Sequence, residues 1–315
     1  MKFRQLILCF LWIVPLSLCA QSTIPEQLQQ ALRLERQGQY AQAVSLLQPI
    51  AESGNLSSSE TDRIWTQIGY AQQEQGNIEA ARRAYEQAIQ LARTLPASMG
   101  DYPTALDNLA DLDQAGGDLR SASRLEHSAL RLFQKSGDHA GTAWALTHLA
   151  VIDLTRKDDR GAQRELERAA KEAEGAADLG KDYYASQASA IAWLAELEGD
   201  PLTATAEYRR SIVLQSCSNC ALTGWRYVLL GKAYAESGEL ALAQMTMRSG
   251  LTILASTAGE HAPKYLAAEL AYARVLDKTG AHSQAAALKI SAQKELNILD
   301  QVPCRTCRDF ASLPW

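Results

Sequence analysis

The sequence predicts an all-α protein built as a solenoid of about seven antiparallel helix hairpins. Three observations support this fold class. Ala, Leu, Gln, Glu and Arg, which are strong helix formers, dominate the chain. Aromatic residues make up only 7% of it, and no string of segments alternates between apolar and polar residues as strands do. A glycine turn followed by regularly placed alanines recurs along the chain, which is the signature of a repeat protein.

The first 20 residues have the layout of a secretory signal peptide. Lys2 and Arg4 come before an almost wholly apolar stretch at residues 6–18. That stretch holds 13 residues, whereas a membrane-spanning helix needs roughly 20. We therefore expect residues 1–20 to be removed as a signal peptide. The mature chain would then act outside the cytoplasm, in the periplasm or as a secreted protein, without a stable membrane span.

Lipid anchoring at Cys19 is a minor alternative to release of the mature chain from the membrane. The residues before Cys19 faintly resemble a bacterial lipoprotein box, but Leu18 stands where that box requires a small residue. A lipoprotein anchored at Cys19 would still be an extracytoplasmic protein.

The charge of the chain argues against nucleic acid as a partner. Removing Lys2 and Arg4 with the signal peptide changes the formal net charge from −5 to −7. The sequence contains no run of Lys and Arg residues that would form a basic patch. Binding to a phosphate backbone depends on clustered positive charge, so we expect no nucleic-acid function.

The repeating unit is clearest between residues 65 and 88. Residues 65–70 read Trp-Thr-Gln-Ile-Gly-Tyr, and they are followed by a turn at Gly76 and then by Ala81, Tyr85 and Ala88. This segment resembles the tetratricopeptide repeat. In that family each unit is two antiparallel helices, and a small residue of the first helix packs against an Ala of the second. The resemblance implies a right-handed superhelical solenoid whose first helices line a concave face.

Six further copies follow the same layout in order along the chain. The turns of all seven copies lie at residues 38, 76, 117, 157, 199, 238 and 280. Successive turns are 38 to 42 residues apart, which is the length of the repeat. After each turn an Ala is expected where the two helices cross: Ala43, Ala81, Ala122, Ala162, Ala204, Ala243 and Ala285. Lys157 replaces the turn glycine in the fourth copy. The seventh copy is the most degenerate in its second helix.

Local chemistry supports the positions of the turns. Gly adopts the left-handed conformation that closes a helix. After Gly199, Asp200 is expected to cap the next helix, with Pro201 in its first turn. A plain helical bundle is the alternative fold, but near-constant spacing over seven copies favours the solenoid. We expect repeats over residues 21–299 and a cysteine-containing tail over 300–315.

An aromatic groove is expected on the first helices of the fourth to sixth copies. The resemblance places six residues on the concave side: Trp144, His148, Val151, Trp193, Trp225 and Val228. Large amphipathic aromatic side chains are favoured at protein interfaces. The alternative is that these tryptophans fill gaps between adjacent hairpins. Trp65, at the packing position of the family, is expected in the core.

The groove positions of the second and third copies give a mixed to acidic surface. They are Arg63, Thr66, Gln73, Glu74, Asp107, Asn108, Asp111 and Gln114. The best-known peptide site of the family is a basic clamp for a chain-terminal carboxylate, and that clamp is missing here. We expect another protein or a peptide as the partner, held by different contacts.

Two CxxC pairs, Cys217 with Cys220 and Cys304 with Cys307, require an explanation. Export favours disulfides, either within each pair or between the pairs. Four thiolates could instead bind zinc, which is not our favoured interpretation, and a redox-active pair is the remaining alternative. A reactive CxxC usually opens a helix in a fold that contains strands, and no strands are expected around these pairs.

No catalytic motif stands out. The histidines, at positions 127, 139, 148, 261 and 282, show no metal-ligand spacing of three or four residues. A phosphate-binding glycine loop and a nucleophile elbow are also missing. The sequence therefore predicts a non-enzymatic scaffold without a cofactor that binds a protein or peptide. The alternative is a thiol-redox or zinc-binding protein using its CxxC pairs.

Overall fold

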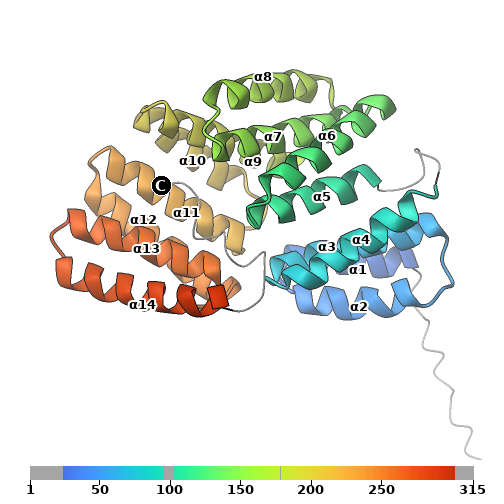
Figure 1. The fold of residues 1–315 in the computed structure, drawn as a ribbon, viewed down its shortest axis with the longest axis horizontal. Helices are drawn as coiled ribbons and strands as arrows, with labels where there is room; N and C mark the ends of the chain where they lie inside the picture. Colours follow the sequence, from blue (N-terminus) through green and yellow to red (C-terminus); the bar gives the residue numbers. More distant parts are fainter. Residues whose placement is uncertain (1–23, 96–101, 178, 302–315) are drawn as a thin grey trace, which may run out of the picture.

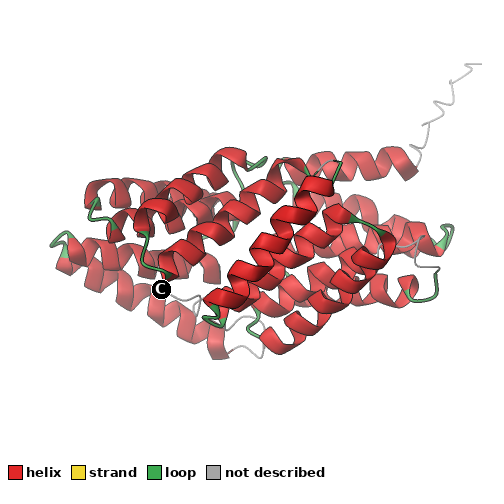
Figure 2. Cartoon of the chain, turned by 90° about the horizontal axis from the view of Figure 1, so that it is seen from above, coloured by secondary structure: helices red, strands yellow, loops and turns green. Residues whose placement is uncertain are grey.

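The structure, a computed structural model, describes residues 24–95, 102–177 and 179–301. These residues form fourteen helices and no strands, and short loops join most of the helices (Figure 2). The helices are α1 (Ile24–Arg36), α2 (Tyr40–Glu52), α3 (Ser58–Glu74), α4 (Ile78–Ala92), α5 (Tyr102–Ala115), α6 (Leu119–Ser136), α7 (His139–Thr155), α8 (Asp159–Gly175), α9 (Gly180–Leu197), α10 (Pro201–Leu214), α11 (Ala221–Glu236), α12 (Leu240–Thr257), α13 (Pro263–Lys278) and α14 (His282–Gln301).

The helices pair in sequence as seven hairpins. Each odd-numbered first helix packs most closely against the second helix that follows it, and each hairpin packs against the next. Figure 1 shows the hairpins following one another along an arc from α1 and α2 to α13 and α14. The predicted all-α solenoid is confirmed.

The seven predicted turn residues all adopt the left-handed conformation. Their φ angles are 72° at Gly38, 77° at Gly76, 76° at Gly117, 60° at Lys157, 77° at Gly199, 82° at Gly238 and 82° at Gly280. Lys157 is the only non-glycine residue with positive φ in the part of the chain that the structure describes. The register of the fourth copy is therefore the one expected, although its turn lacks the glycine.

Replacing Lys157 by Gly should raise the free energy of unfolding by about 0.5–1 kcal/mol. A left-handed residue with a Cβ costs about 1–2 kcal/mol, and the greater chain entropy of Gly cancels part of the gain. Equilibrium unfolding in urea measures the change. The reciprocal variant Gly76→Lys, at a turn where no atom lies within 4 Å of an added Cβ, should lose a similar amount. Equal stability of Lys157→Gly and wild type would show that the turn carries no strain.

The crossing alanines form the spine of the core. All seven, from Ala43 to Ala285, are 0% exposed. In the second copy a Cβ atom at Gly69 would lie 2.5 Å from the ring of Tyr85, so the small residue makes room for the aromatic one. Asp200 caps α10 by accepting a hydrogen bond from the Thr203 amide at 3.1 Å, as predicted. Small residues at the crossings let the paired helices approach closely.

Three predictions fall outside the described residues. They are the signal peptide at residues 1–20, lipid anchoring at Cys19, and the second cysteine pair, Cys304 and Cys307. Among the helices that the structure describes, none is long and apolar enough to cross a membrane.

Candidate functional site on the inner face

The first helices lie on the inner side of the curved stack. Four of the six successive pairs of first helices pack against each other: α3 on α5, α5 on α7, α7 on α9, and α11 on α13. No two successive second helices among the described residues pack to the same extent. The side on which neighbours approach most closely is the inside of the curve. We call the side formed by the first helices the inner face, and it corresponds to the expected concave face.

The middle of the inner face carries half-buried aromatic and apolar side chains. Trp144 and Val151 on α7 and Trp193 on α9 are all partly exposed. Val151 and Trp193 pack against the core between α7, α8 and α9. Trp144 contacts Tyr183 edge to face, with ring centroids 5.4 Å apart. These side chains are held in place by packing against the core, and part of their surface stays exposed to solvent.

Two residues expected in the groove belong to the core instead. Trp225 is 8% exposed and Val228 is 0% exposed, both packed between α11, α12 and α13. For Val228 the reason is the close crossing of α11 and α12 at Gly250, where an added Cβ would lie 2.9 Å from Val228 Cγ2. Trp225 packs into the same core cluster. Trp225 and Val228 were expected in the groove, and the structure places both in the core instead.

His148 lies among three carboxylates. Its Nδ1 atom is 2.9 Å from Asp107 Oδ1 and 3.2 Å from Glu126 Oε1. Asp111 Oδ1 is 3.7 Å from the same nitrogen. The side chains of Glu126, Asp107 and His148 are 0%, 11% and 15% exposed, and that of Asp111 is 37% exposed. Three helices, α5, α6 and α7, meet at this carboxylate–histidine cluster.

Burial and mutual repulsion shift the titration of the cluster. Burial raises the pKa of Glu126 well above its usual range, and Asp107 raises it further. Burial also raises the pKa of Asp111, to about 6. Burial alone would lower the pKa of His148, but the charges of Asp107 and Asp111 and the hydrogen bonds it makes raise this pKa well above its ordinary value. The carboxylates thus favour the protonated form of the imidazole.

The sequence predicted that His148 would face the groove, but it did not predict the cluster of carboxylates around this residue. The partners are 41 and 22 residues away along the chain, too far for any local motif. One feature of the sequence, the residue at a repeat position that is usually apolar, does indicate the cluster. Four residues after the crossing Ala, most copies place a buried apolar or aromatic residue: Leu47, Tyr85, Leu166, Tyr208 and Met247. The third copy has Glu126 there, and a carboxylate at a core position requires a partner.

Polar groups continue the inner face on both sides of the aromatic centre. Toward the C-terminus, Lys232 on α11 pairs with Glu196 on α9 at 2.9 Å. Toward the N-terminus, Glu74 at the end of the first helix α3 accepts a hydrogen bond at 3.5 Å from the hydroxyl of Tyr40, the first residue of the second helix α2. The turn at Gly38 lies beside the loop that precedes α11, because a Cβ at Gly38 would be 3.9 Å from the Asn219 carbonyl oxygen. The stack thus curves far enough for its first hairpin to approach the sixth.

The first cysteine pair lies in the loop before α11 with both thiols free. Cys220 is buried, and its thiol donates to the Cys217 carbonyl at 3.4 Å. Burial, together with the neighbouring Cys220, raises the pKa of Cys217 to about 12. A reactive thiol needs a lowered pKa, so this environment disfavours redox catalysis at Cys217.

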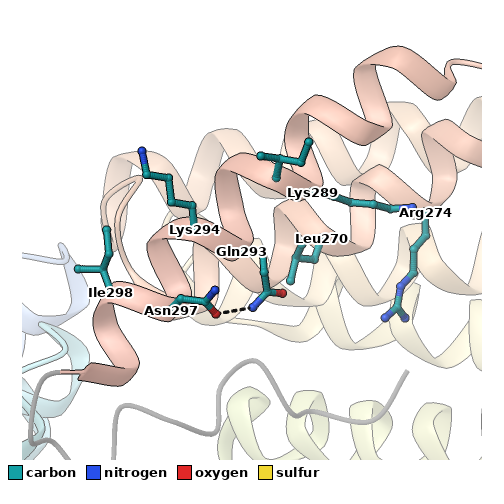
Figure 3. A pocket seen from close by; sticks show the side chains of 8 residues that line it. Leu270, Arg274, Lys289, Gln293, Lys294, Asn297 and Ile298 are labelled. Carbon is teal, nitrogen blue, oxygen red and sulfur yellow. Dashed lines mark hydrogen bonds between the residues drawn. The ribbon is translucent and has the colours of Figure 1, made fainter.

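A shallow hollow of about 760 Å³ lies along the last hairpin (Figure 3). It is lined by Leu270, Arg274, Lys289, Ile290, Gln293, Lys294, Asn297 and Ile298. Ile290 and Ile298 are 71% and 55% exposed. In every earlier repeat the next hairpin covers the corresponding surface. Five of the eight residues that line the hollow are polar, as expected of a terminal repeat that faces solvent, but the surface of the hollow itself is mainly apolar.

Comparison with known sequences agrees with the repeat geometry. The family model described as "Tetratricopeptide repeat" matches residues 62–95, which hold most of α3 and all of α4. The matched unit is the hairpin in which Gly69 packs under Tyr85. Residues 62–95 of this chain therefore form a tetratricopeptide repeat. No curated protein matches this repeat protein significantly along its sequence.

Solved structures match the fold of the repeat protein over most of its length. A Rap protein complexed with competence and sporulation factor has a TM-score of 0.57 at 13% identity, covering 92% of this chain and 94% of that one. The apo form of RapI has a TM-score of 0.58 at 12% identity, covering 87% and 99%. A chain of the Cut9–Hcn1 hetero-tetramer of the APC/C has a TM-score of 0.54 at 16% identity, covering 91% and 55%. At these identities the likeness concerns the fold.

Proposed function

We propose that this repeat protein is a non-enzymatic scaffold that binds a protein or peptide on its inner face, outside the cytoplasm. The observation that carries the proposal is the set of partly exposed side chains on successive first helices, above all Trp144, Val151 and Trp193. Aromatic side chains held on a rigid base bind partners with little loss of conformational entropy. The N-terminal sequence supports the location.

The chemistry of the inner face favours binding over catalysis. The Nδ1 atom of His148 is engaged by carboxylates on neighbouring helices, which leaves that nitrogen poorly placed to act on a substrate. Glu196 and Lys232 likewise neutralise each other. One solenoid of similar fold was solved in complex with competence and sporulation factor, which supports the use of this architecture for holding a ligand.

Affinity capture tests the proposal. The mature chain, residues 21–315, is tethered and exposed to an extract of the native envelope, and retained proteins are identified and then titrated in purified form. Trp193→Ala should weaken the retained partner about ten-fold or more, because a central aromatic side chain often dominates an interface. The matched control is Val213→Ala, which removes an apolar side chain that is 82% exposed on the second helix α10.

Circular dichroism separates binding from folding in this comparison. Trp193 also packs against the core between α7 and α9, so the variant must retain wild-type helix content at the temperature of the assay. Equal binding by wild type and a folded Trp193→Ala variant would contradict the proposal. If only Val213→Ala abolished binding of the partner, the binding site would lie on the second helices instead.

A further inference from the structure

The carboxylate–histidine cluster has the spacing of a metal site. One ligand atom from each of Asp107, Glu126 and His148 lies within 4.8 Å of the other two. Zinc bonds to carboxylate oxygen and imidazole nitrogen are about 2.0–2.2 Å long, so ligand atoms of a tetrahedral site lie about 3.3–3.5 Å apart. The distances of 2.9 and 3.2 Å from His148 Nδ1 to the two carboxylates are close to that value. Small side-chain adjustments would place all three atoms on one ion.

The hydrogen bonds within the cluster leave Glu126 incompletely satisfied. Its side chain is 0% exposed, and its Oε2 atom is buried without a hydrogen-bond partner among the described residues. His148 Nδ1 carries at most one proton, yet both Asp107 and Glu126 approach it. A single N–H cannot satisfy two carboxylates. A buried carboxylate oxygen without a partner is costly, and a bound metal ion would supply that partner.

We propose that Asp107, Glu126 and His148 form a binding site for one divalent transition-metal ion, with zinc as the first candidate. The ion replaces the proton on His148 Nδ1 and takes one oxygen from each carboxylate. Mixed nitrogen and oxygen ligands suit zinc, whereas magnesium and calcium prefer oxygen alone. The site is independent of the four cysteines and of the proposed scaffold function.

Asp111 gives the site an entrance from the inner face. Its side chain is 37% exposed, and its Oδ1 is 3.7 Å from His148 Nδ1. It is placed to supply a fourth ligand after a small rotation, or to leave that position to water. The bound ion would join α5 and α6 of the third copy to α7 of the fourth. It would also fix the ring of His148, whose centroid is 5.5 Å from that of Trp144.

Zinc titration of the mature chain tests the proposal once the cysteines are removed as competing ligands. Cys217, Cys220, Cys304 and Cys307 are replaced together by Ser, and the metal-free protein is titrated with zinc chloride by calorimetry. We expect one ion per chain with a micromolar or lower dissociation constant. His148→Gln should weaken binding at least ten-fold, whereas His282→Gln, at a histidine whose side chain is 76% exposed, should leave it unchanged.

Cobalt spectroscopy provides a test that needs no substitution within the cluster. Cobalt bound to the Ser-substituted chain should show visible absorption of low-symmetry nitrogen and oxygen coordination, without a thiolate charge-transfer band. Zinc should displace it and should raise the melting temperature of this chain but not of its His148→Gln variant. Failure of the Ser-substituted chain to bind zinc or cobalt would overturn the proposal, as would binding that His148→Gln leaves unchanged.

Discussion

Replacing Tyr85 by Ala is expected to lower the free energy of unfolding by about 3–5 kcal/mol, the usual cost of deleting a buried aromatic ring. Tyr85 is 0% exposed and belongs to the largest core cluster. Its ring fills the space that Gly69 leaves open. In a linear stack each hairpin is held by its neighbours alone, so a cavity between α3 and α4 cannot be compensated by distant contacts. Equilibrium unfolding in urea, followed by circular dichroism, measures the loss.

Tyr85→Phe is the matched control for this prediction. It keeps the ring and removes only the hydroxyl that donates to Gln73 Oε1 at 2.9 Å, which should cost about 1 kcal/mol. If the Ala variant were no less stable than the Phe variant, the crossing of Gly69 and Tyr85 would not hold the second hairpin together.

Replacing Glu35 by Gln should stabilise the protein by about 2 kcal/mol at pH 8 and by little at pH 4. Glu35 on α1 is 7% exposed, and its Oε1 has no hydrogen-bond partner among the described residues. Burial raises its pKa from 4.5 to about 7. Because the pKa is higher in the folded chain than in the unfolded one, the wild type loses stability as pH rises from about 4.5 to about 7. Gln carries no charge and avoids that loss.

Urea unfolding of both proteins at several pH values tests this sign. The control is Glu86→Gln, at an exposed position on α4, which should change stability by less than about 0.5 kcal/mol at any pH. A stability difference between Glu35→Gln and wild type that does not grow from pH 4 to pH 8 would contradict burial as the cause.

The repeat architecture was predictable because its determinants are local and recur. A turn needs a left-handed residue, and a helix crossing needs a small one, so both leave marks at fixed spacing. The turns from Gly38 to Gly280 and the crossing alanines lie where the sequence predicts them. Even the exception at Lys157 follows the spacing, since its neighbours in the stack set the position of the turn.

The composition of the inner face was harder to predict because it depends on how closely neighbouring helices approach. Trp225 and Val228 resemble groove residues along α11, yet both lie in the core, Val228 at the close crossing of α11 and α12 at Gly250. The carboxylate–histidine cluster joins three helices that are distant in sequence. Asp107, Asp111 and His148 were expected on the concave face of adjacent copies, but the spacing does not show that they meet at one point. Only Glu126, a carboxylate at an apolar repeat position, signals the cluster beforehand.

Hydrogen–deuterium exchange of the mature chain, with and without its captured partner, shows which helices the partner covers. We expect slower exchange in the first helices α7 and α9 on binding, together with unchanged exchange in the second helices α8 and α10. Protection confined to α8 and α10, or to the last hairpin, would contradict binding on the inner face.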